Sequence, residues 1–185
     1  MKVTHTALPG VVLFEPTVFP DPRGLVFEVW NRQRYAAIGL SEDFVQDNVS
    51  LSKHGVLRGL HYQHPDAQGK LVSALRGRIY DVAVDIRVGS PTFRRWVGVI
   101  LDDDTRGQLY IPPGFAHGFQ VLSADALVLY KLTRLYDPRG ERSILWSDED
   151  IAIDWQDDPI ISAKDAKGLR LRELAASSLP SYTIP

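Results

Sequence analysis

The sequence predicts a mainly β protein that folds as an antiparallel sandwich or jelly-roll barrel with a few short peripheral helices. Two observations support this class: the short apolar runs in the middle of the chain, and the turn residues between them. The middle of the chain consists of short apolar runs, and glycine and proline residues separate them at 89–91, 112–114 and 138–140. With 185 residues, 44% of them hydrophobic, the chain is long enough for one good core and short for two. We therefore expect a single domain over residues 1–185.

The clearest strand is predicted in the run RIYDVAVDIR, residues 78–87. Large apolar residues alternate there with acidic or small ones, which is the period of two of a half-buried strand. The apolar positions are Tyr80, Val82, Val84 and Ile86, and the others are Asp81, Ala83 and Asp85. Similar runs rich in β-branched and aromatic residues occupy residues 94–101, 107–113, 118–122 and 126–136.

Helical signal is confined to three places in the sequence. They are Asn31–Ile38, a turn after Ser147–Asp150, and the stretch after Ser162. The C-terminal tail AASSLPSYTIP, about residues 175–185, is expected to be loosely held or packed at an interface.

The charge balance argues against polyanionic partners. The chain carries 21 basic and 23 acidic side chains, a net charge of -2, so no overall field attracts nucleic acid or anionic lipid. The lack of cysteine excludes a disulfide framework, a thiolate metal site and a cysteine nucleophile. The apolar run before Glu15 is too short for a signal peptide or a membrane span. We expect a soluble, cytoplasmic protein that binds anions through a local cluster, with no nucleic-acid or membrane partner.

The segment VLRGLHYQHPDAQGKLV, residues 56–72, places His61 among basic residues. Arg58 lies three positions before it and Lys70 nine after it, so the three side chains could face one cavity from adjacent antiparallel strands. An isolated histidine in a strand is more often a hydrogen-bonded core residue. A second histidine-bearing segment, YIPPGFAHGFQVL with His117, instead favours a site built in the mouth of a barrel.

A metal site would need His61, His64 and His117 as ligands. The sequence has no glutamate between Glu42 and Glu141, and residues three apart on a strand point to opposite faces. Two histidines without a carboxylate make a poor ligand set for iron, manganese or zinc. We therefore expect no metal.

Acid–base chemistry is the remaining catalytic interpretation. An imidazole suits proton abstraction near neutral pH when a carboxylate orients its ring, and a tyrosine hydroxyl is a fitting acid. Tyr130 lies in a predicted strand, where packing in the core is the simpler explanation. A lysine or arginine is needed wherever an oxyanion develops. Pattern and spacing alone leave a barrel with either an acid–base site or an anion-binding site.

Ten blocks of the sequence resemble, in order, those of the dTDP-4-dehydrorhamnose 3,5-epimerase family, which belongs to the cupin superfamily of jelly-roll barrels. The resemblance runs from about Gly10 to Leu169, nearly the whole chain. One such block would be weak support, whereas ten in register are specific. The blocks are DPRGLVFE, FVQDN, VLRGLHYQ, AQGKLV, DVAVDIR, GSPTF, IPPGFAHGF, YKLT, SILW and SAKD.

The resemblance implies roles for individual residues. It makes His61 the base, Asp165 its orienting carboxylate, Tyr130 the acid across the sugar ring, and Lys70 the residue that steadies the enolate oxygen. The implied substrate is a dTDP-linked 4-keto-6-deoxyhexose, inverted at C3 and C5 without metal or cofactor. The implied assembly is a homodimer whose N-terminal segment reaches into the neighbour's site. Implied diphosphate and nucleotide contacts, including an aromatic stacked near the thymine, fall on Arg23, Glu28, Gln46, Asn48, Arg58, His117, Tyr136, Glu141 and Lys164.

Three departures from the family pattern are expected to lie near the substrate. Val26 replaces a common phenylalanine, Val49 replaces a usual polar residue, and the loop at 62–69 is one residue shorter. They leave open whether one or both centres are inverted, and whether a rhamnose or an antibiotic-sugar pathway uses the product. The alternatives are a single-centre epimerase, a metal-dependent cupin such as a dioxygenase, and a non-catalytic sugar-nucleotide binding barrel.

Overall fold

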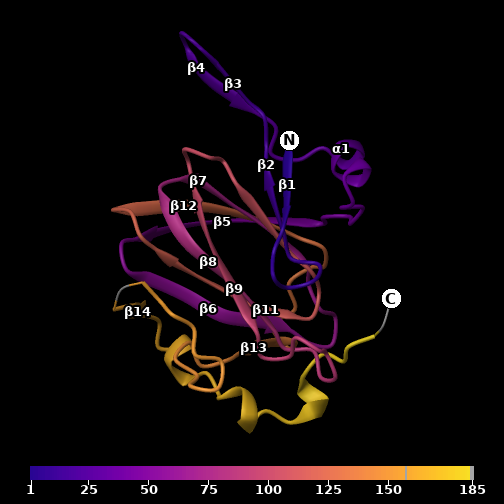
Figure 1. Cartoon of the computed structure of the whole chain (residues 1–185). Helices are drawn as coiled ribbons and strands as arrows, with labels where there is room; N and C mark the ends of the chain where they lie inside the picture. The colour runs from indigo at the N-terminus through magenta and orange to yellow at the C-terminus, as the bar shows by residue number, and fades with distance from the viewer. Residues whose placement is uncertain (157, 184–185) are drawn as a thin grey trace.

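The computed structural model describes residues 1–156 and 158–183, and two β-sheets face each other to form a barrel (Figure 1). The predicted mainly β, jelly-roll class is confirmed. The first sheet has the strand order β1 (Lys2–His5), β2 (Val12–Glu15), β10 (Gln108–Ile111), β7 (Lys70–Arg76), β12 (Asp125–Leu132) and β5 (Gln46–Lys53). The second has the order β13 (Glu141–Ser143), β6 (Val56–Gln63), β11 (Phe115–Val121), β8 (Arg78–Asp85) and β9 (Trp96–Asp102), and β14 (Ile160–Ile161) pairs with β6 in parallel.

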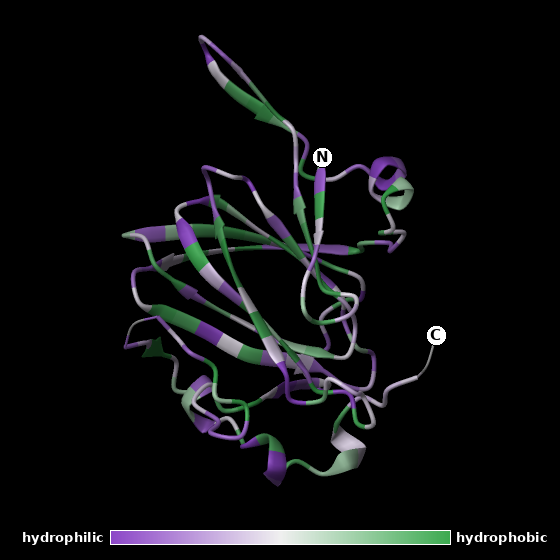
Figure 2. Cartoon of the chain, viewed as in Figure 1, coloured by the Kyte–Doolittle hydropathy of each residue, from purple (hydrophilic) through white to green (hydrophobic). Residues whose placement is uncertain are grey.

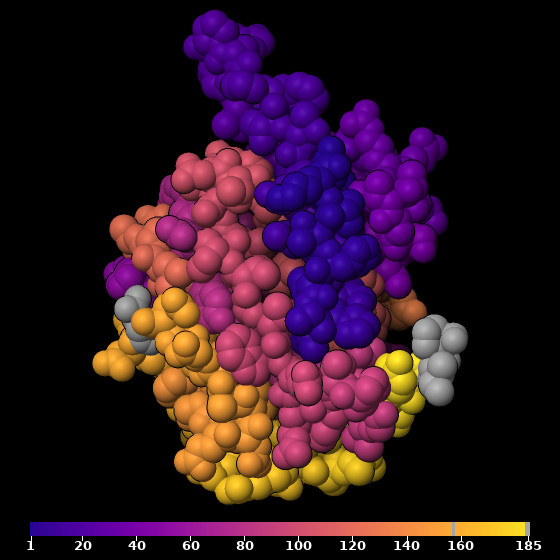
Figure 3. Space-filling view, viewed as in Figure 1, coloured from indigo at the N-terminus to yellow at the C-terminus, as the bar shows by residue number. Residues whose placement is uncertain are grey.

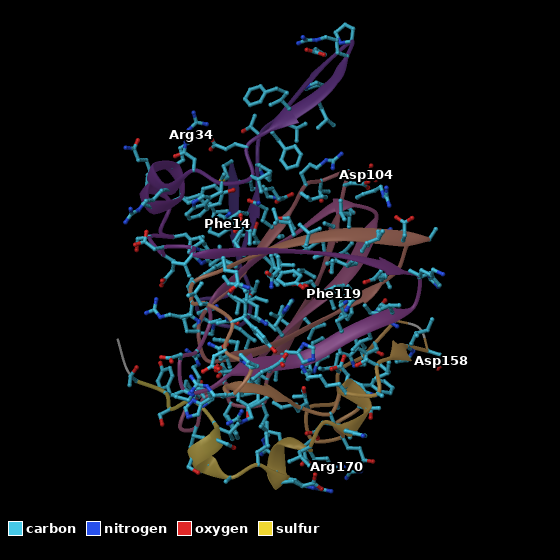
Figure 4. All side chains as sticks on the ribbon, turned by 180° about the vertical axis from the view of Figure 1, so that it is seen from behind. Phe14, Arg34, Asp104, Phe119, Asp158 and Arg170 are labelled. Carbon is cyan, nitrogen blue, oxygen red and sulfur yellow. The ribbon has the colours of Figure 1, made fainter. Side chains whose placement is uncertain are left out.

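The barrel interior is filled by apolar side chains from both sheets. Apolar and polar residues alternate along several barrel strands (Figure 2), as expected when one face of a strand points inward. Phe119 lies between the sheets (Figure 4) and packs with Val72, Ala83 and Val128 in the main core cluster.

The prediction that residues 78–87 form a half-buried strand is wrong in one respect. The strand is present as β8, but both of its faces are buried from Ile79 to Asp85. Its outer face, with Val82 and Val84, is covered by residues from the C-terminal part of the chain, among them Leu171 and Leu179. The opposite face, which carries Asp81 and Asp85, points into the barrel, and both of these side chains are fully buried.

The predicted helix at residues 31–38 is confirmed as α1 (Arg32–Ala37). Its N-cap is Asn31, whose side-chain oxygen accepts a hydrogen bond from the backbone N–H of Arg34, and Tyr35 is its buried contact with the barrel. The stretch after Ser162 forms three short 3-10 helices, at Asp165–Lys167, Leu171–Glu173 and Ala176–Ser178. Within the described residues, no helix is both long and apolar enough to cross a membrane.

The C-terminal tail is tied to the barrel as far as Tyr182. The backbone N–H of Val88 donates to the carbonyl of Pro180, and the N–H of Tyr182 donates to the carbonyl of Val88. The Arg87 guanidinium lies 5.0 Å from the centre of the Tyr182 ring. These contacts do not fit a loosely held tail, and the part of that expectation that falls on residues 184–185 lies outside the described residues.

A two-stranded hairpin of β3 (Val18–Asp21) and β4 (Gly24–Phe27) stands out from the barrel as a narrow arm (Figures 1 and 3). It pairs with neither barrel sheet. Phe19, Leu25 and Val26 on this hairpin are exposed. A free-standing two-stranded hairpin is marginally stable in water, so a surface that covers these apolar side chains would stabilise the arm.

Candidate active site

A cavity of about 230 Å³ lies between the two sheets. Strands β5, β7 and β12 of the first sheet and β6, β11 and β13 of the second supply most of its walls. The structure thus brings Arg58, His61 and Lys70 to one cavity, although not from adjacent strands as expected, because β6 and β7 belong to different sheets. The lining residues are Asn48, Arg58, His61, Tyr62, Gln63, Gln68, Lys70, His117, Phe119, Tyr130, Leu132, Tyr136 and Glu141.

His61 is paired with Asp165 at one wall of this cavity. The Nε2 atom of His61 lies 2.6 Å from Oδ1 of Asp165, which is itself almost completely buried. With the proton on Nε2 donated to this carboxylate, Nδ1 of His61 carries the free lone pair. The pair can therefore accept a proton at Nδ1 and stabilise the resulting imidazolium.

Asp165 is held in place by its surroundings. Its backbone N–H donates to the hydroxyl of Ser162 at 3.0 Å, and the N–H of Gly59 donates to Oδ2 at 3.5 Å. Burial raises the pKa of Asp165, but the hydrogen bond and charge of His61, with the other donors, outweigh this effect and hold the pKa below its usual range. Asp165 is therefore an ionised partner for His61 at neutral pH.

The glycines beside the two cavity histidines allow β6 and β11 to approach closely. Gly59 has a φ of +125°, and a Cβ atom placed there would lie 2.6 Å from Cα of Gly118. Only glycine fits this position without backbone movement. The close approach sets His61 directly opposite His117 in the strand register.

Tyr130 and Lys70 face the cavity from the opposite sheet. Tyr130 and Leu132 alternate with Lys131 on β12; both line the cavity, while Lys131 pairs with Asp47 at 2.7 Å. Lys70 begins β7, where it is the register partner of Leu132. Burial lowers the pKa of Lys70 to about 8, although the charges of Asp81 and Glu141 act in the other direction. Tyr130 is thus on the wall across from the His61–Asp165 pair.

His117 is buried beside His61 at the inner end of the site. Its Nε2 atom lies 2.8 Å from Oδ1 of Asp81, a fully buried residue of β8. Burial lowers the pKa of His117, and the nearby charge of Asp81 only partly offsets this. At neutral pH His117 is therefore an uncharged hydrogen-bonding group.

Five further predicted contacts form a connected network at the cavity rim. The Gln46 side chain donates to Oδ1 of Asn48 at 3.0 Å and accepts the backbone N–H of Tyr136 at 2.8 Å. The hydroxyl of Tyr136 donates to Glu141 at 2.8 Å, and Lys164 pairs with the same carboxylate at 2.5 Å. Burial raises the pKa of Glu141, but the bonds from Lys164 and Tyr136 outweigh it and keep it below its usual range.

Arg58 lies on β6 with its side chain exposed at the cavity, and its Nε atom donates to the hydroxyl of Ser52 at 3.0 Å. Among the residues that the structure describes, no protein acceptor binds the terminal guanidinium nitrogens of Arg58, so they are open to a ligand. A planar guanidinium in this position suits the oxygens of a diphosphate.

Two predicted contacts are not at this cavity. Arg23 is on the projecting hairpin, where its side chain is 88% exposed and pairs with Asp21 at 2.6 Å. Glu28 follows the hairpin and contacts Asn31 at 3.1 Å and Arg34 at 3.5 Å, at a separate surface hollow. Within this chain, neither residue meets the other predicted contacts.

The departures at Val26 and Val49 were expected near the substrate, and neither residue lines the cavity of this chain. Val26 is exposed on the hairpin arm. Val49 is exposed on β5, because Gln46, Asn48 and Ser50 point inward and the alternate residues point out. His64, the third candidate metal ligand, is not among the residues that line the cavity.

Sequence reasoning missed Asp81, Ser162 and Gln63. The Gln63 side chain joins two loops at the rim, since it donates to the carbonyls of Asp66 and Leu135 and accepts the N–H of Asp137. A carboxylate in the middle of an apolar strand was an available signal for Asp81. No group of three or more histidine, cysteine or acidic side chains is arranged to hold a metal in the described part of the chain.

A family model described as dTDP-4-dehydrorhamnose 3,5-epimerase matches residues 5–173. The chain belongs to this family. A dTDP-4-dehydrorhamnose 3,5-epimerase from Pseudomonas aeruginosa is 54% identical over 171 residues, which cover 91% of this chain and 94% of the relative.

Solved structures of the epimerase family superpose closely on this chain. The 3,5-epimerase from Legionella pneumophila, in complex with dTDP-4-keto-L-rhamnose, has a TM-score of 0.96 and 47% identity, and the match covers 99% of both chains. A 3'-monoepimerase from Streptomyces bikiniensis, in complex with dTDP-quinovose, has a TM-score of 0.87 and 34% identity over 96% of this chain and 92% of that one. The family thus includes relatives described as acting on two centres and on one.

Proposed function

We propose that this protein is an isomerase that inverts C3 and C5 of a dTDP-4-keto-6-deoxyhexose, in the biosynthesis of dTDP-rhamnose. The observation that carries the proposal is the placement of the His61–Asp165 pair and Tyr130 on opposite sheets, at the walls of one cavity. Inversion needs a base on one face of the sugar and an acid on the other. The family membership of this chain, and its relatives described as 3,5-epimerases, support the same reaction.

The first step is proton abstraction next to the ketone. The C4 carbonyl acidifies the hydrogens on C3 and C5, since loss of either gives an enolate conjugated with that carbonyl. Nδ1 of His61 takes the proton, and Asp165 stabilises the imidazolium through Nε2. The ammonium group of Lys70 offsets the negative charge that develops on the C4 oxygen.

The second step is reprotonation from the other wall. The Tyr130 hydroxyl delivers a proton to the opposite face of the enolate, which inverts the centre and leaves His61 protonated and Tyr130 as the phenolate. After His61 returns its proton to water and Tyr130 takes one up, the same two steps at the other carbon complete the reaction. Each correctly placed acid or base of this kind contributes about 10²–10⁴-fold in rate. The reaction so written needs no cofactor.

Substrate binding is assigned to the cavity rim. Arg58 grips the diphosphate, since its planar fork matches phosphate oxygens better than a lysine does. Gln46, Asn48, Tyr136, Glu141 and Lys164 surround the remaining nucleotide, with the Tyr136 ring available for stacking on the base. His117 is buried opposite His61 and uncharged at neutral pH, which suits contact with the sugar better than with a phosphate.

The pKa of Lys70 predicts a loss of activity at alkaline pH. Lysine is cationic below its pKa, so the group that stabilises the enolate is present at pH 7 and is lost as the pH rises through about 8. We expect kcat to fall about tenfold per pH unit above that value. A kcat profile from pH 6 to 10 checks this, and a flat profile to pH 10 would contradict the role of Lys70. In the Lys70→Arg variant kcat should instead stay constant at alkaline pH, because arginine stays charged.

Inversion of one centre alone is the second candidate, since the Streptomyces bikiniensis relative is described as a 3'-monoepimerase. The two are distinguished by incubating the protein with dTDP-4-keto-6-deoxyglucose and trapping the product with a 4-keto reductase. A rhamno-configured product supports double inversion. A product inverted at one carbon would replace it with the second candidate, and recovery of unchanged sugar would remove both.

We further propose a homodimer in which the hairpin arm of each chain completes the neighbour's site. This accounts for the placement of Arg23 and Glu28 away from the cavity that holds the other predicted contacts. In such a dimer the partner's surface would also cover the exposed side chains of Phe19, Leu25 and Val26. One epimerase domain over residues 1–185 and a cytoplasmic location stay predictions of the sequence.

Mixed dimers test this assembly. Arg23→Ala removes the donated contact and Tyr130→Phe removes the resident acid, so each variant alone should have little activity. If the arm acts in the partner's site, mixing the two gives heterodimers with one intact site, and the activity of a 1:1 mixture should rise well above that of either variant. An additive mixture, or a monomer in sedimentation equilibrium, would contradict the proposal.

A further inference from the structure

The arm of β3 and β4 leaves the barrel without pairing with either sheet, so its direction is set where it is rooted. Its outgoing strand ends at Phe27, and Glu28, a predicted contact of the neighbour's site, follows directly. The incoming strand is tied to the outgoing one, since Val18 is the register partner of Phe27. The contacts of residues 27–29 with the barrel therefore help to set the direction of the whole arm.

A buried polar network fixes the chain just beyond Glu28. Gln108 of β10 is fully buried, and its side-chain nitrogen donates to the carbonyl of Val29 at 2.9 Å and to the hydroxyl of Ser73 at 3.0 Å. Its side-chain oxygen accepts a hydrogen bond from the hydroxyl of Tyr35, the buried residue of α1. The nitrogen and the oxygen of this amide are both bonded, and a fully satisfied buried network holds one geometry. Val29 is thus a fixed point on the barrel.

With Val29 fixed, the arm can still swing about the two residues before it, and Arg106 opposes this motion. Arg106 lies between β9 and β10, and its guanidinium carbon is 5.2 Å from the centre of the Phe27 ring. One terminal nitrogen donates to the carbonyl of Leu75 on β7 at 3.0 Å, which ties the guanidinium to the barrel. A cation at this distance from a ring centre is attracted to the face of the ring. Arg106 thus bridges the barrel and the last residue of the arm.

The conformation of Arg106 is unfavourable in two respects. Its φ of +58° is uncommon for a residue other than glycine, and its Nε atom is buried with no hydrogen-bond partner among the described residues. A residue held in this way persists only where the surrounding contacts fix it. What the arrangement provides is the guanidinium contact at the root of the arm.

We propose that Arg106 is a positioning residue for the neighbour's site, which holds the root of the arm so that Arg23 and Glu28 are presented there in a set place. The inference rests on the proposed homodimer, in which the arm acts in the partner's site. Arg106 touches no substrate and acts through Phe27. An arm that is already aimed loses less freedom on binding than one that swings. Loosening the root should therefore weaken substrate binding and leave the acid–base chemistry unchanged.

Arg106→Ala removes the guanidinium from the Phe27 ring. Apparent affinity falls in proportion to the fraction of time for which the arm is correctly placed, so we expect KM for the keto-sugar and Kd for dTDP to rise about threefold to tenfold. The value of kcat should stay within about twofold of wild type, because the base and the acid come from other elements. Phe27→Leu removes the same contact from the arm and should give the same split, which keeps the proposal testable if Arg106→Ala does not fold.

Arg94→Ala is the matched control. Arg94 is likewise an arginine with a positive φ, of +69°, and its guanidinium carbon is 5.9 Å from the centre of the Phe93 ring. It lies between β8 and β9, outside the arm and the cavity lining. KM and Kd should not change in this variant. An unchanged KM in folded Arg106→Ala or folded Phe27→Leu, or an equal rise in Arg94→Ala, would overturn the proposal.

Heterodimers purified through two different affinity tags show in which site Arg106 acts. Pairing Arg106→Ala with Tyr130→Phe leaves one working site, in the Arg106→Ala chain. That site receives an intact arm from its partner, and its KM should equal that of wild type. Pairing the double variant Arg106→Ala/Tyr130→Phe with a wild-type chain leaves a working site that receives the loosened arm, and its KM should rise.

Equal KM values in the two heterodimers, or the reverse order, would overturn the proposal, because Arg106 would then act within its own chain. If Arg23→Ala and Tyr130→Phe do not complement each other in mixed dimers, the homodimer proposal fails instead. The two failures are therefore distinguishable.

Discussion

Replacing His61 with asparagine is expected to lower kcat by about 10²–10⁴-fold, because the variant has no base next to C3 or C5. The amide can still donate a hydrogen bond toward Asp165, so the fold and the affinity for dTDP should change little. The rate is measured with the keto-sugar and the affinity by calorimetry with dTDP. Exchange of the C3 and C5 hydrogens with heavy water should fall together with kcat.

His64→Asn is the matched control for this prediction. It is the same substitution three residues along the chain, at a side chain that is not among those lining the cavity. Its kcat should stay within about twofold of wild type, because the change leaves the base and the acid in place and surface substitutions alter stability by only about 0.5 kcal/mol. Rapid exchange in His61→Asn, or an equal loss in His64→Asn, would show that His61 is not the base.

Replacing Tyr130 with phenylalanine should separate proton exchange from inversion. His61 can still remove a proton and return one to the same face, so deuterium continues to enter the substrate. Delivery from the opposite wall is lost, and formation of the inverted product should fall by about 10²–10⁴-fold. Proton NMR in heavy water measures both quantities in one sample, as the rate of deuterium entry and the rate of epimer formation.

Tyr80→Phe serves as the comparison, since Tyr80 packs in the cluster on the outer face of the second sheet. The ratio of exchange to inversion should be that of the wild type. If exchange and inversion fall in parallel in Tyr130→Phe, the acid on the opposite wall is another group.

Local structure followed from local sequence. The helix at residues 32–37 begins at Asn31 because a short polar side chain can cap its first turn. The alternation at residues 78–87 predicted β8 correctly because the period of two is a property of the strand itself. What covers the outer face of that strand was not predictable in the same way, because Leu171 and Leu179 lie far along the chain.

The catalytic pair shows the same limit. His61 and Asp165 are 104 positions apart, so spacing could not join them, and it was the resemblance of the SAKD block that predicted the pair. Asp81 was missed because alternation assigns the acidic positions of a strand to solvent by default. The structure places this face inside the barrel, where a carboxylate needs partners. Arg23 and Glu28 are separated from the cavity in one chain, and their predicted role depends on a second copy.

The most direct test of a base and an acid acting from opposite walls is the wild-type reaction with dTDP-4-keto-6-deoxyglucose in heavy water. Proton NMR should show deuterium entering at both C3 and C5, with a product inverted at both carbons. Entry at one carbon alone would contradict double inversion. No entry at either carbon, from folded protein that binds dTDP, would contradict the epimerase mechanism itself.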